Sequence, residues 1–213
     1  MTGEARSDHG GPTADPETMR VYAEQAEAYV ERITRMEPDA DLLAFIAAVR
    51  PRGLVLDWGC GPGNSAAMMA AADLRVEATD ASPKMAELAR ELGVKVQVEP
   101  FEALRRRPKF DGIWANFSLL HATRAQVPLL IALASVALMP DGVLHLGMKT
   151  VPEDGRLEGR DTMGRFFSYW SEEDLAAACR SAGLEPRSAR HGAGTGLDGR
   201  IEPYVIMLAA KTA

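Results

Sequence analysis

The sequence is poor in cysteine and has no long apolar run, and each shortage excludes a class of protein. Cys60 and Cys179 are the only cysteines among 213 residues, so the chain has neither a disulfide framework nor the cysteine spacing of a metal site. The longest apolar run, 129–139, is well short of the roughly 20 residues that span a membrane. The N-terminus lacks the charged-then-apolar pattern of a signal peptide. We therefore predict a cytoplasmic protein without a metal and without a membrane partner.

Positive charge is also scarce. The 24 lysines and arginines are outnumbered by 30 aspartates and glutamates, which gives a net charge of −6. Proteins that bind nucleic acid usually carry a basic surface, so this balance argues against DNA or RNA as a partner. The one basic run, 105–107, is interpreted as a solvated helix end. A monomer and a homodimer both stay open.

The apolar content is 46%, which is typical of a folded domain of this length. Residues 1–15 are polar without apolar periodicity and are predicted to form a mobile N-terminal tail. Residues 16–213 are predicted to form a single domain. Its first part, 16–50, carries two segments of helical apolar spacing and is predicted to be a helical cap.

From residue 54 onward, short apolar segments alternate with amphipathic ones, which predicts βαβ units and a parallel sheet. Two segments are predicted to connect elements of this pattern. Pro140-Asp141-Gly142 is a turn signal, and the glycine-rich stretch 192–196 favours a flexible hairpin connection. The last two strands have no helix between them, so the last strand is predicted to be antiparallel. The fold class is therefore α/β, with a Rossmann-like, seven-stranded, mostly parallel sheet and helices on both faces. The predicted strands are 54–56, 75–79, 95–98, 112–115, 143–148, 185–190 and 204–210, and the predicted helices after residue 54 are 65–72, 83–92, 125–138 and 172–182.

The most informative segment, residues 55–65, reads VLDWGCGPGNS. A buried strand followed by glycines lets the chain turn sharply and lets a ligand approach bare backbone. A dinucleotide fingerprint requires a third glycine where this chain has Asn64. Asp57 would also repel a pyrophosphate and attract a cationic ligand. The pattern therefore favours a ligand with an ammonium group over NAD.

This segment resembles the D-x-G-x-G-x-G loop of class I S-adenosylmethionine-dependent methyltransferases. The resemblance implies that Asp57 holds the amino group of the cofactor and that Gly59, Cys60, Gly61 and Gly63 form the loop behind its methionine portion. The alternative is a tight glycine turn beside a satisfied aspartate.

A second acidic residue, Asp80, ends the next predicted strand, 23 residues after Asp57. An ionised carboxylate accepts two hydrogen bonds at once, which suits the vicinal hydroxyls of a ribose. We therefore predict that Asp80 and the adjacent Ala81 bind the ribose. The alternative is that Asp80 caps the following helix, a role that Ser82 can fill.

The resemblance extends to residues around the adenine and in front of the cofactor. It implies that an acid and an apolar wall follow the third strand, that residues after the fourth strand line the space toward the acceptor, and that a tyrosine-bearing helix covers the cofactor. Ordinary packing explains Met85, Phe101, Tyr22 and Tyr29 as an alternative. The cofactor-binding candidates implied here are Glu99, Phe101, Met85, Asn116, Tyr22 and, with it, Tyr29.

The acceptor side is less distinct. His121 follows the fourth strand and is the candidate general base, with a packed histidine as the alternative. Ser118 lies in the same turn and is a candidate for substrate binding. Arg160, Arg165 and Tyr169 come from a stretch rich in arginine and aromatic residues, which would suit an anionic, partly apolar acceptor or else form a plain surface loop.

The turn at 116–119 reads NFSL and lacks the Asn/Asp-Pro-Pro-Tyr/Phe signature of methyltransferases that modify base amines or glutamine. The predicted function is thus methyl transfer from S-adenosyl-L-methionine to a small-molecule acceptor, with S-adenosyl-L-homocysteine as product. The alternatives are a nicotinamide-dependent oxidoreductase and a non-catalytic S-adenosylmethionine-binding protein.

Overall fold

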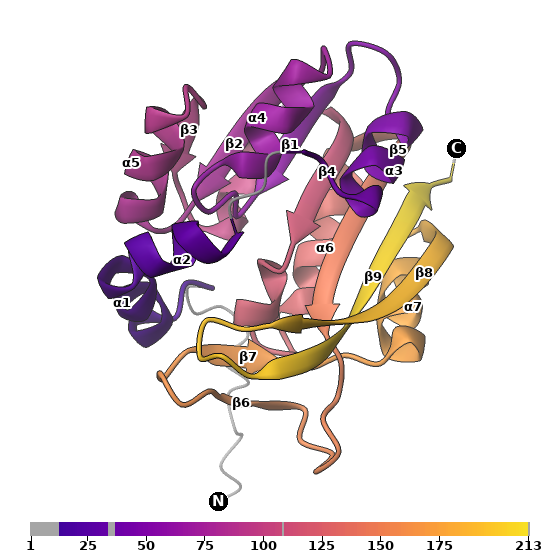
Figure 1. Ribbon diagram of the computed structural model, residues 1–213. Helices are drawn as coiled ribbons and strands as arrows, with labels where there is room; N and C mark the ends of the chain where they lie inside the picture. Colours follow the sequence, from indigo (N-terminus) through magenta and orange to yellow (C-terminus); the bar gives the residue numbers. More distant parts are fainter. Residues whose placement is uncertain (1–12, 34–36, 108, 213) are drawn as a thin grey trace, which may run out of the picture.

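A seven-stranded sheet forms the centre of the molecule, and its strands follow the apolar segments of the sequence (Figure 1). The computed structural model describes residues 13–33, 37–107 and 109–212. The strands of this sheet are β1 (Leu54–Trp58), β2 (Arg75–Asp80), β3 (Val96–Val98), β4 (Phe110–Asn116), β5 (Leu138–Lys149), β8 (Leu184–Thr195) and β9 (Ile201–Lys211).

The strand order is β3-β2-β1-β4-β5-β9-β8. The pairs from β3 to β5 are all parallel, whereas β9 is antiparallel to both of its neighbours, β5 and β8. The last strand therefore runs against the rest of the sheet, which confirms the predicted fold class.

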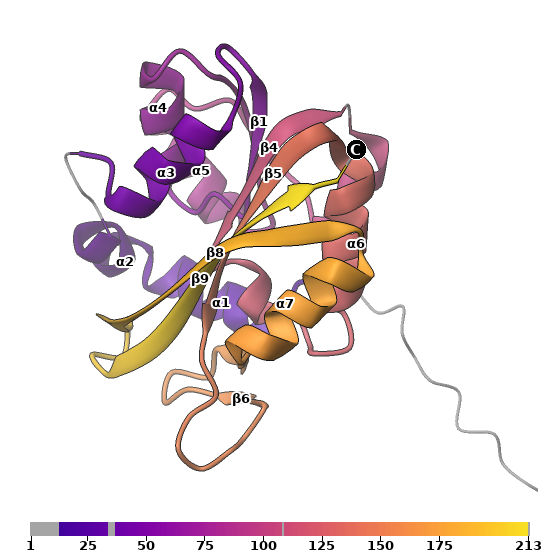
Figure 2. The same ribbon diagram turned by 90° about the vertical axis from the view of Figure 1, so that its right-hand side faces the viewer.

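Helices cover both faces of the sheet because side chains of a strand alternate between its two faces. In β1, Val55 packs with Phe45 and Met69 on one face. Leu56 and Trp58 point to the other face and join the largest apolar cluster. Figure 2 shows α3, α4 and α5 on one side of the strands and α6 and α7 on the other. Their bounds are α3 Ala40–Ala48, α4 Asn64–Ala71, α5 Pro83–Glu91, α6 Val127–Ala137 and α7 Glu172–Ser181.

Two short helices precede this core, α1 (Pro16–Glu24) and α2 (Ala26–Ile33). The Asp15 carboxylate accepts the Thr18 N–H at 2.8 Å and caps α1, and Pro16 occupies the first turn. Thr13 donates its backbone N–H and its hydroxyl to Glu102. The end of the predicted tail is therefore anchored, and residues 1–12 lie outside the described residues.

Three segments differ from the sequence-based expectation. The turn signal at Pro140–Gly142 lies inside β5, where Phe110 pairs with Leu138 but Gly112 pairs with Val143. The extra residues on β5 form a bulge, which places the turn-favouring residues within a strand. The stretch that carries Arg160 and Arg165, for which a plain surface loop was one alternative, contains a hairpin of two short strands, β6 (Glu158–Arg160) and β7 (Phe166–Ser168), which pair only with each other.

The third difference concerns the glycine-rich stretch 192–196, which was expected to be a flexible connection. Most of it belongs to β8, and Gly192 lies opposite Tyr204 of β9. A Cβ atom on Gly192 would lie 2.5 Å from the Tyr204 ring. The glycine therefore admits an aromatic ring against the strand rather than loosening it.

Within the described ranges, no helix is both long enough and apolar enough to cross a membrane.

Candidate cofactor and acceptor site

A cavity of about 760 Å³ opens at the carboxyl ends of β1, β2 and β4. Ligands of open α/β sheets bind at this edge. Most of the predicted cofactor and acceptor residues line it. They are Tyr22, Asp57, Gly59, Cys60, Gly61, Asp80, Ala81, Met85, Phe101, Asn116, Ser118 and His121, together with Tyr29.

The loop after β1 requires glycine at three positions. Gly59, Gly61 and Gly63 have φ values of +80°, +54° and +87°, a region that other residues rarely adopt. A Cβ atom on Gly59 would lie 2.5 Å from the Cβ of Ser118. On Gly63 it would lie 2.9 Å from the Cβ of Ala89, so Gly63 lets α5 pack closely and does not line the cavity.

Asp80 joins the two loops that border the cavity. One of its carboxylate oxygens accepts the N–H of Gly61 at 2.8 Å, and the other accepts the N–H of Ser82 at 2.8 Å. Burial raises the pKa of Asp80, against the effect of these two N–H groups. Each oxygen has a second lone pair, so the carboxylate can still accept ligand hydroxyls. Ser82 caps α5 by accepting the N–H of Met85, so the alternative role for Asp80 is filled.

The cavity is predominantly acidic. Burial, together with the charges of Asp57 and Asp80, raises the pKa of Cys60 far above its usual range, so this residue stays a neutral thiol. An acidic cavity favours a cationic ligand. Five carboxylates (Asp15, Asp39, Asp41, Asp57 and Asp80) and two guanidinium groups (Arg32 and Arg190) line it.

Of the three residues predicted to surround the adenine, two line the cavity and one does not. Phe101 begins the short 3-10 helix η1 (Phe101–Arg106) and meets the Trp58 ring edge-on at 5.4 Å, and both it and Met85 line the cavity. Glu99 does not. Its carboxylate turns away to Arg107, with a distance of 2.5 Å between Oε2 and Nη2.

Beyond β4 the chain makes a strained turn. Phe117 has a φ of +54°, an uncommon conformation for a bulky residue that often marks a functional site. Its neighbour Ser118 donates its hydroxyl to the Trp58 carbonyl at 2.6 Å. Asn116 Oδ1 and His145 Nε2 are 3.1 Å apart. This turn directs the Phe117 ring into the cavity.

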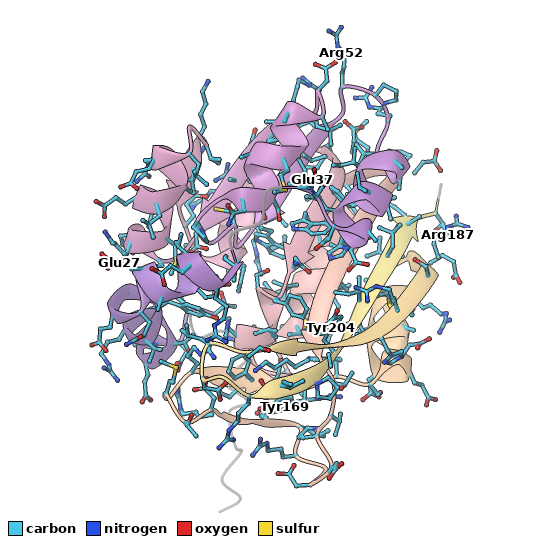
Figure 3. The ribbon with its side chains drawn as sticks, viewed as in Figure 1. Glu27, Glu37, Arg52, Tyr169, Arg187 and Tyr204 are labelled. Atoms are coloured by element: carbon cyan, nitrogen blue, oxygen red, sulfur yellow. The ribbon has the colours of Figure 1, made fainter. Side chains whose placement is uncertain are left out.

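A second cavity of about 180 Å³ adjoins the first. The two share several walls, including Tyr22, Tyr29, Phe117, His121 and Tyr204. Tyr204 is labelled on β9 in Figure 3. The second cavity has further lining residues that the main cavity lacks, among them Lys149, Arg165, Phe167 and Glu202.

His121 ends the 3-10 helix η2 (Leu119–His121) and stands between the two cavities. Its Nδ1 lies 2.7 Å from the Phe166 carbonyl oxygen, so Nδ1 carries the proton and donates it. Its Nε2 lies 2.9 Å from the Tyr22 hydroxyl and therefore accepts from it. Burial lowers the pKa of His121 to about 3. The ring is thus neutral, and both of its nitrogens are engaged.

Of the other residues predicted to bind the acceptor, the structure places one in a cavity lining and two outside it. Arg165 lines the second cavity, where it donates to the Tyr22 hydroxyl at 3.2 Å and pairs with Asp161. Arg160 lines neither cavity, and it pairs with Asp15 at the edge of the main one. Tyr169, labelled in Figure 3, is buried beneath Arg156, 5.5 Å from the ring centroid to the guanidinium, and lines neither cavity.

Several lining residues had no distinct sequence signal, notably Phe117, Lys149, Glu202 and Tyr204. Lys149 ends β5, just as Asp80 ends β2, and this position at the end of a strand was the one signal available for it. Arg32 was also missed. It lines both cavities and donates to the Gly196 carbonyl at 2.6 Å, which connects α2 to the β8–β9 hairpin.

Comparisons with known proteins agree with this geometry. The sequence model of the family described as "Methyltransferase domain" matches residues 55–142. The chain is 39% identical over 122 residues to the trans-aconitate 2-methyltransferase of Methylobacterium radiotolerans, covering 54% of this chain and 44% of that protein. It is 32% identical over 185 residues to the 27-O-demethylrifamycin SV methyltransferase of Amycolatopsis mediterranei, covering 79% and 66%. The chain thus spans less than half of the first relative.

Solved structures share the fold. A 1,6-didemethyltoxoflavin-N1-methyltransferase of Burkholderia thailandensis, bound to S-adenosylhomocysteine, superimposes with a TM-score of 0.67 at 24% identity and covers 96% of this chain and 93% of that one. The [4+2]-cyclase SpnF superimposes with a TM-score of 0.70 at 18% identity and covers 96% and 99%.

The chain belongs to the class I S-adenosylmethionine-dependent methyltransferase family of enzymes. This confirms the predicted family and its cofactor, S-adenosylmethionine. The acidic cavity and the loop that needs glycine fit that cofactor, which carries a sulfonium and an ammonium group.

Proposed function

We propose that this protein transfers the methyl group of S-adenosylmethionine to a small-molecule acceptor held in the second cavity. The observation that carries the proposal is the pair of adjoining cavities, one acidic and one aromatic, that meet at His121 and Tyr22. When bound, the cofactor supplies an activated methyl group, so the protein mainly has to orient the acceptor.

The residues divide this task between the two cavities. In the first, Asp57 would hold the ammonium group, and Asp80 would accept hydrogen bonds from the ribose hydroxyls while it fixes the Gly61 N–H. Phe101 and Met85 would flank the adenine. In the second cavity the aromatic walls would exclude water from the acceptor.

The alternative functions have less support. A nicotinamide cofactor would place a pyrophosphate against the carboxylates of Asp57 and Asp80, and Asn64 stands where a dinucleotide loop has glycine. A role in binding without methyl transfer is compatible with the fold, since folds host many functions and a [4+2]-cyclase superimposes on this chain. The second cavity, with its distinct lining, favours an acceptor.

Calorimetric titration with S-adenosylmethionine, S-adenosylhomocysteine and NADH tests the cofactor. We expect both sulfur nucleotides to bind and NADH not to bind. A screen with methyl-labelled cofactor then tests transfer, with trans-aconitate in the acceptor panel because several relatives are named for it. Binding of NADH alone, or cofactor binding without transfer to any acceptor of a broad panel, would contradict the proposal.

A further inference from the structure

We propose that the second cavity binds the methyl acceptor as a carboxylate, that Lys149 is the cation that holds it, and that the carboxylate oxygen is itself the nucleophile. This inference rests on the proposed function and specifies the acceptor class. Four observations support it: the charge balance of the cavity, the donors of Lys149 that remain available, the aromatic walls, and the engagement of the side chains in the described lining that could act as a base.

The charged side chains that line the second cavity are mostly cationic. Arg32, Lys149 and Arg165 line it, and Glu202 is the one carboxylate among the described lining residues. Asp161 pairs with Arg165 from outside the lining. The charge of this cavity is therefore opposite to that of the acidic main cavity beside it. The main cavity would favour a cationic cofactor, and the second cavity would favour an anionic acceptor.

Lys149 is the cation best placed for an acceptor. Its side chain is 12% exposed at the end of β5, its ammonium pairs with Glu202, and the same ammonium lies 3.5 Å from the centroid of the Phe167 ring. Burial lowers its pKa, while the Glu202 carboxylate opposes this effect and favours the charged form. Glu202 is its one hydrogen-bond acceptor among the described residues, whereas an ammonium has three donors.

The walls of the cavity suit an unsaturated or aromatic acid. Tyr22 and Tyr29 contact each other edge-on with ring centroids 5.1 Å apart. Phe117 and Tyr204 make a similar contact at 5.3 Å on another side of the lining. An apolar acceptor body would pack on these rings while its anionic end reaches Lys149.

Among the lining residues that the structure describes, no group is available to deprotonate an acceptor. Both nitrogens of His121 are engaged, and its pKa is lowered to about 3. The Glu202 carboxylate is held by Lys149. Burial raises the pKa of Tyr22 above its usual value. An alcohol would lack a base here, and a protonated amine would meet like charge, whereas a carboxylate with a pKa of roughly 4 is already ionised at neutral pH.

The chemistry balances without a proton transfer. A lone pair of the carboxylate oxygen forms the new C–O bond to the methyl carbon, and the C–S bond breaks with its electron pair going to sulfur. The sulfonium and the carboxylate are both neutralised, and the products are a methyl ester and S-adenosylhomocysteine. No oxidant or further reactant is needed.

The test uses three probes of similar shape: benzoate, benzyl alcohol and benzylamine. Calorimetry measures their binding to the protein saturated with S-adenosylhomocysteine, and labelled cofactor measures methyl transfer. Lys149→Met removes the charge but keeps an unbranched chain, and Lys149→Arg retains the charge. Lys95→Met is the matched control, because Lys95 is exposed and lines neither cavity.

We expect benzoate to bind and to be methylated in preference to the other two probes. Lys149→Met should weaken benzoate binding about 10- to 100-fold, the range of a charge-assisted hydrogen bond, with S-adenosylhomocysteine affinity unchanged. Lys149→Arg should retain most of the binding, and Lys95→Met should match the wild type.

Three results would overturn the inference while leaving the proposed function intact. The first is methylation of benzylamine or benzyl alcohol but not of benzoate. The second is wild-type benzoate affinity in Lys149→Met. The third is failure to bind, in the protein saturated with S-adenosylhomocysteine, both of benzoate and of two further carboxylates measured in the same way, phenylacetate and succinate. Failure of S-adenosylhomocysteine itself to bind would instead contradict the proposed function.

Discussion

Replacing His121 by glutamine tests whether this side chain stays uncharged in the folded protein. Glutamine cannot titrate, and its amide can still donate and accept one hydrogen bond each. In the wild type, burial is the main cause of the low pKa of His121, and the Phe166 carbonyl opposes it by hydrogen bonding. Arg165 and Lys149 also disfavour the charged ring, while Asp161 favours it.

The magnitude follows from linkage between protonation and folding. The pKa of His121 falls from 6.5 to about 3 in the folded protein, so below about pH 6.5 the unfolded chain binds a proton that the folded one does not. This contribution lowers stability as the pH falls and levels off below the folded pKa. Each pH unit is equivalent to about 1.36 kcal/mol, so the loss reaches about 2 kcal/mol near pH 5.

Urea denaturation of the wild type and of His121→Gln at about pH 7.5 and about pH 5 measures this term, because all other titrating groups are common to both proteins. The free energy of unfolding of the variant, relative to the wild type, should rise by about 2 kcal/mol between the two conditions. An unchanged difference would mean that His121 titrates normally in the fold. It would then be available as a general base, and the argument for an ionised acceptor would lose its support.

Two further predictions concern the cofactor loop. Gly59→Ala should lower the free energy of unfolding by about 2–4 kcal/mol and abolish S-adenosylhomocysteine binding. The added Cβ atom would sit on a residue with a positive φ and would clash with Ser118. Gly93→Ala is its control, since Gly93 has a similar φ of +79° with nothing within 4 Å, and denaturation should reveal a loss of only about 1 kcal/mol. Asp80→Ala should weaken S-adenosylhomocysteine binding by about 1–3 kcal/mol in calorimetry, and wild-type affinity would remove Asp80 from the ribose site.

The local sequence was sufficient to predict the place of a site residue where that place depends only on one strand and the turn that follows it. Asp57 lies one residue before the end of β1, and Asp80 ends the neighbouring parallel strand β2. Their meeting at one edge of the sheet therefore followed from the alternation of strands and helices in the sequence. The Ser82 cap was likewise readable from the residues next to it.

Prediction failed where a partner distant in sequence, or a single contact, decides the outcome. The Glu99 carboxylate is turned from the cavity by Arg107, and nothing before residue 99 signals that pair. The stretch 192–196 was predicted to be a flexible hairpin connection, because the ring that Gly192 accommodates belongs to Tyr204 on another strand and leaves no local signal. Lys149 could be recognised as a cavity residue only from the structure, which places the Phe167 ring and β9 beside it.

The hydrogen bond from Arg32 to Gly196 has a consequence for how ligands enter and leave. It joins α2, whose one buried residue is Ala26, to the outer end of the β8–β9 hairpin, and both segments lie over the rims of the two cavities. Because most residues of α2 are at least partly exposed, this helix can move away from the hairpin at a small local cost while the sheet stays folded. A change that fastens α2 to the β8–β9 hairpin is therefore expected to slow the exchange of ligands.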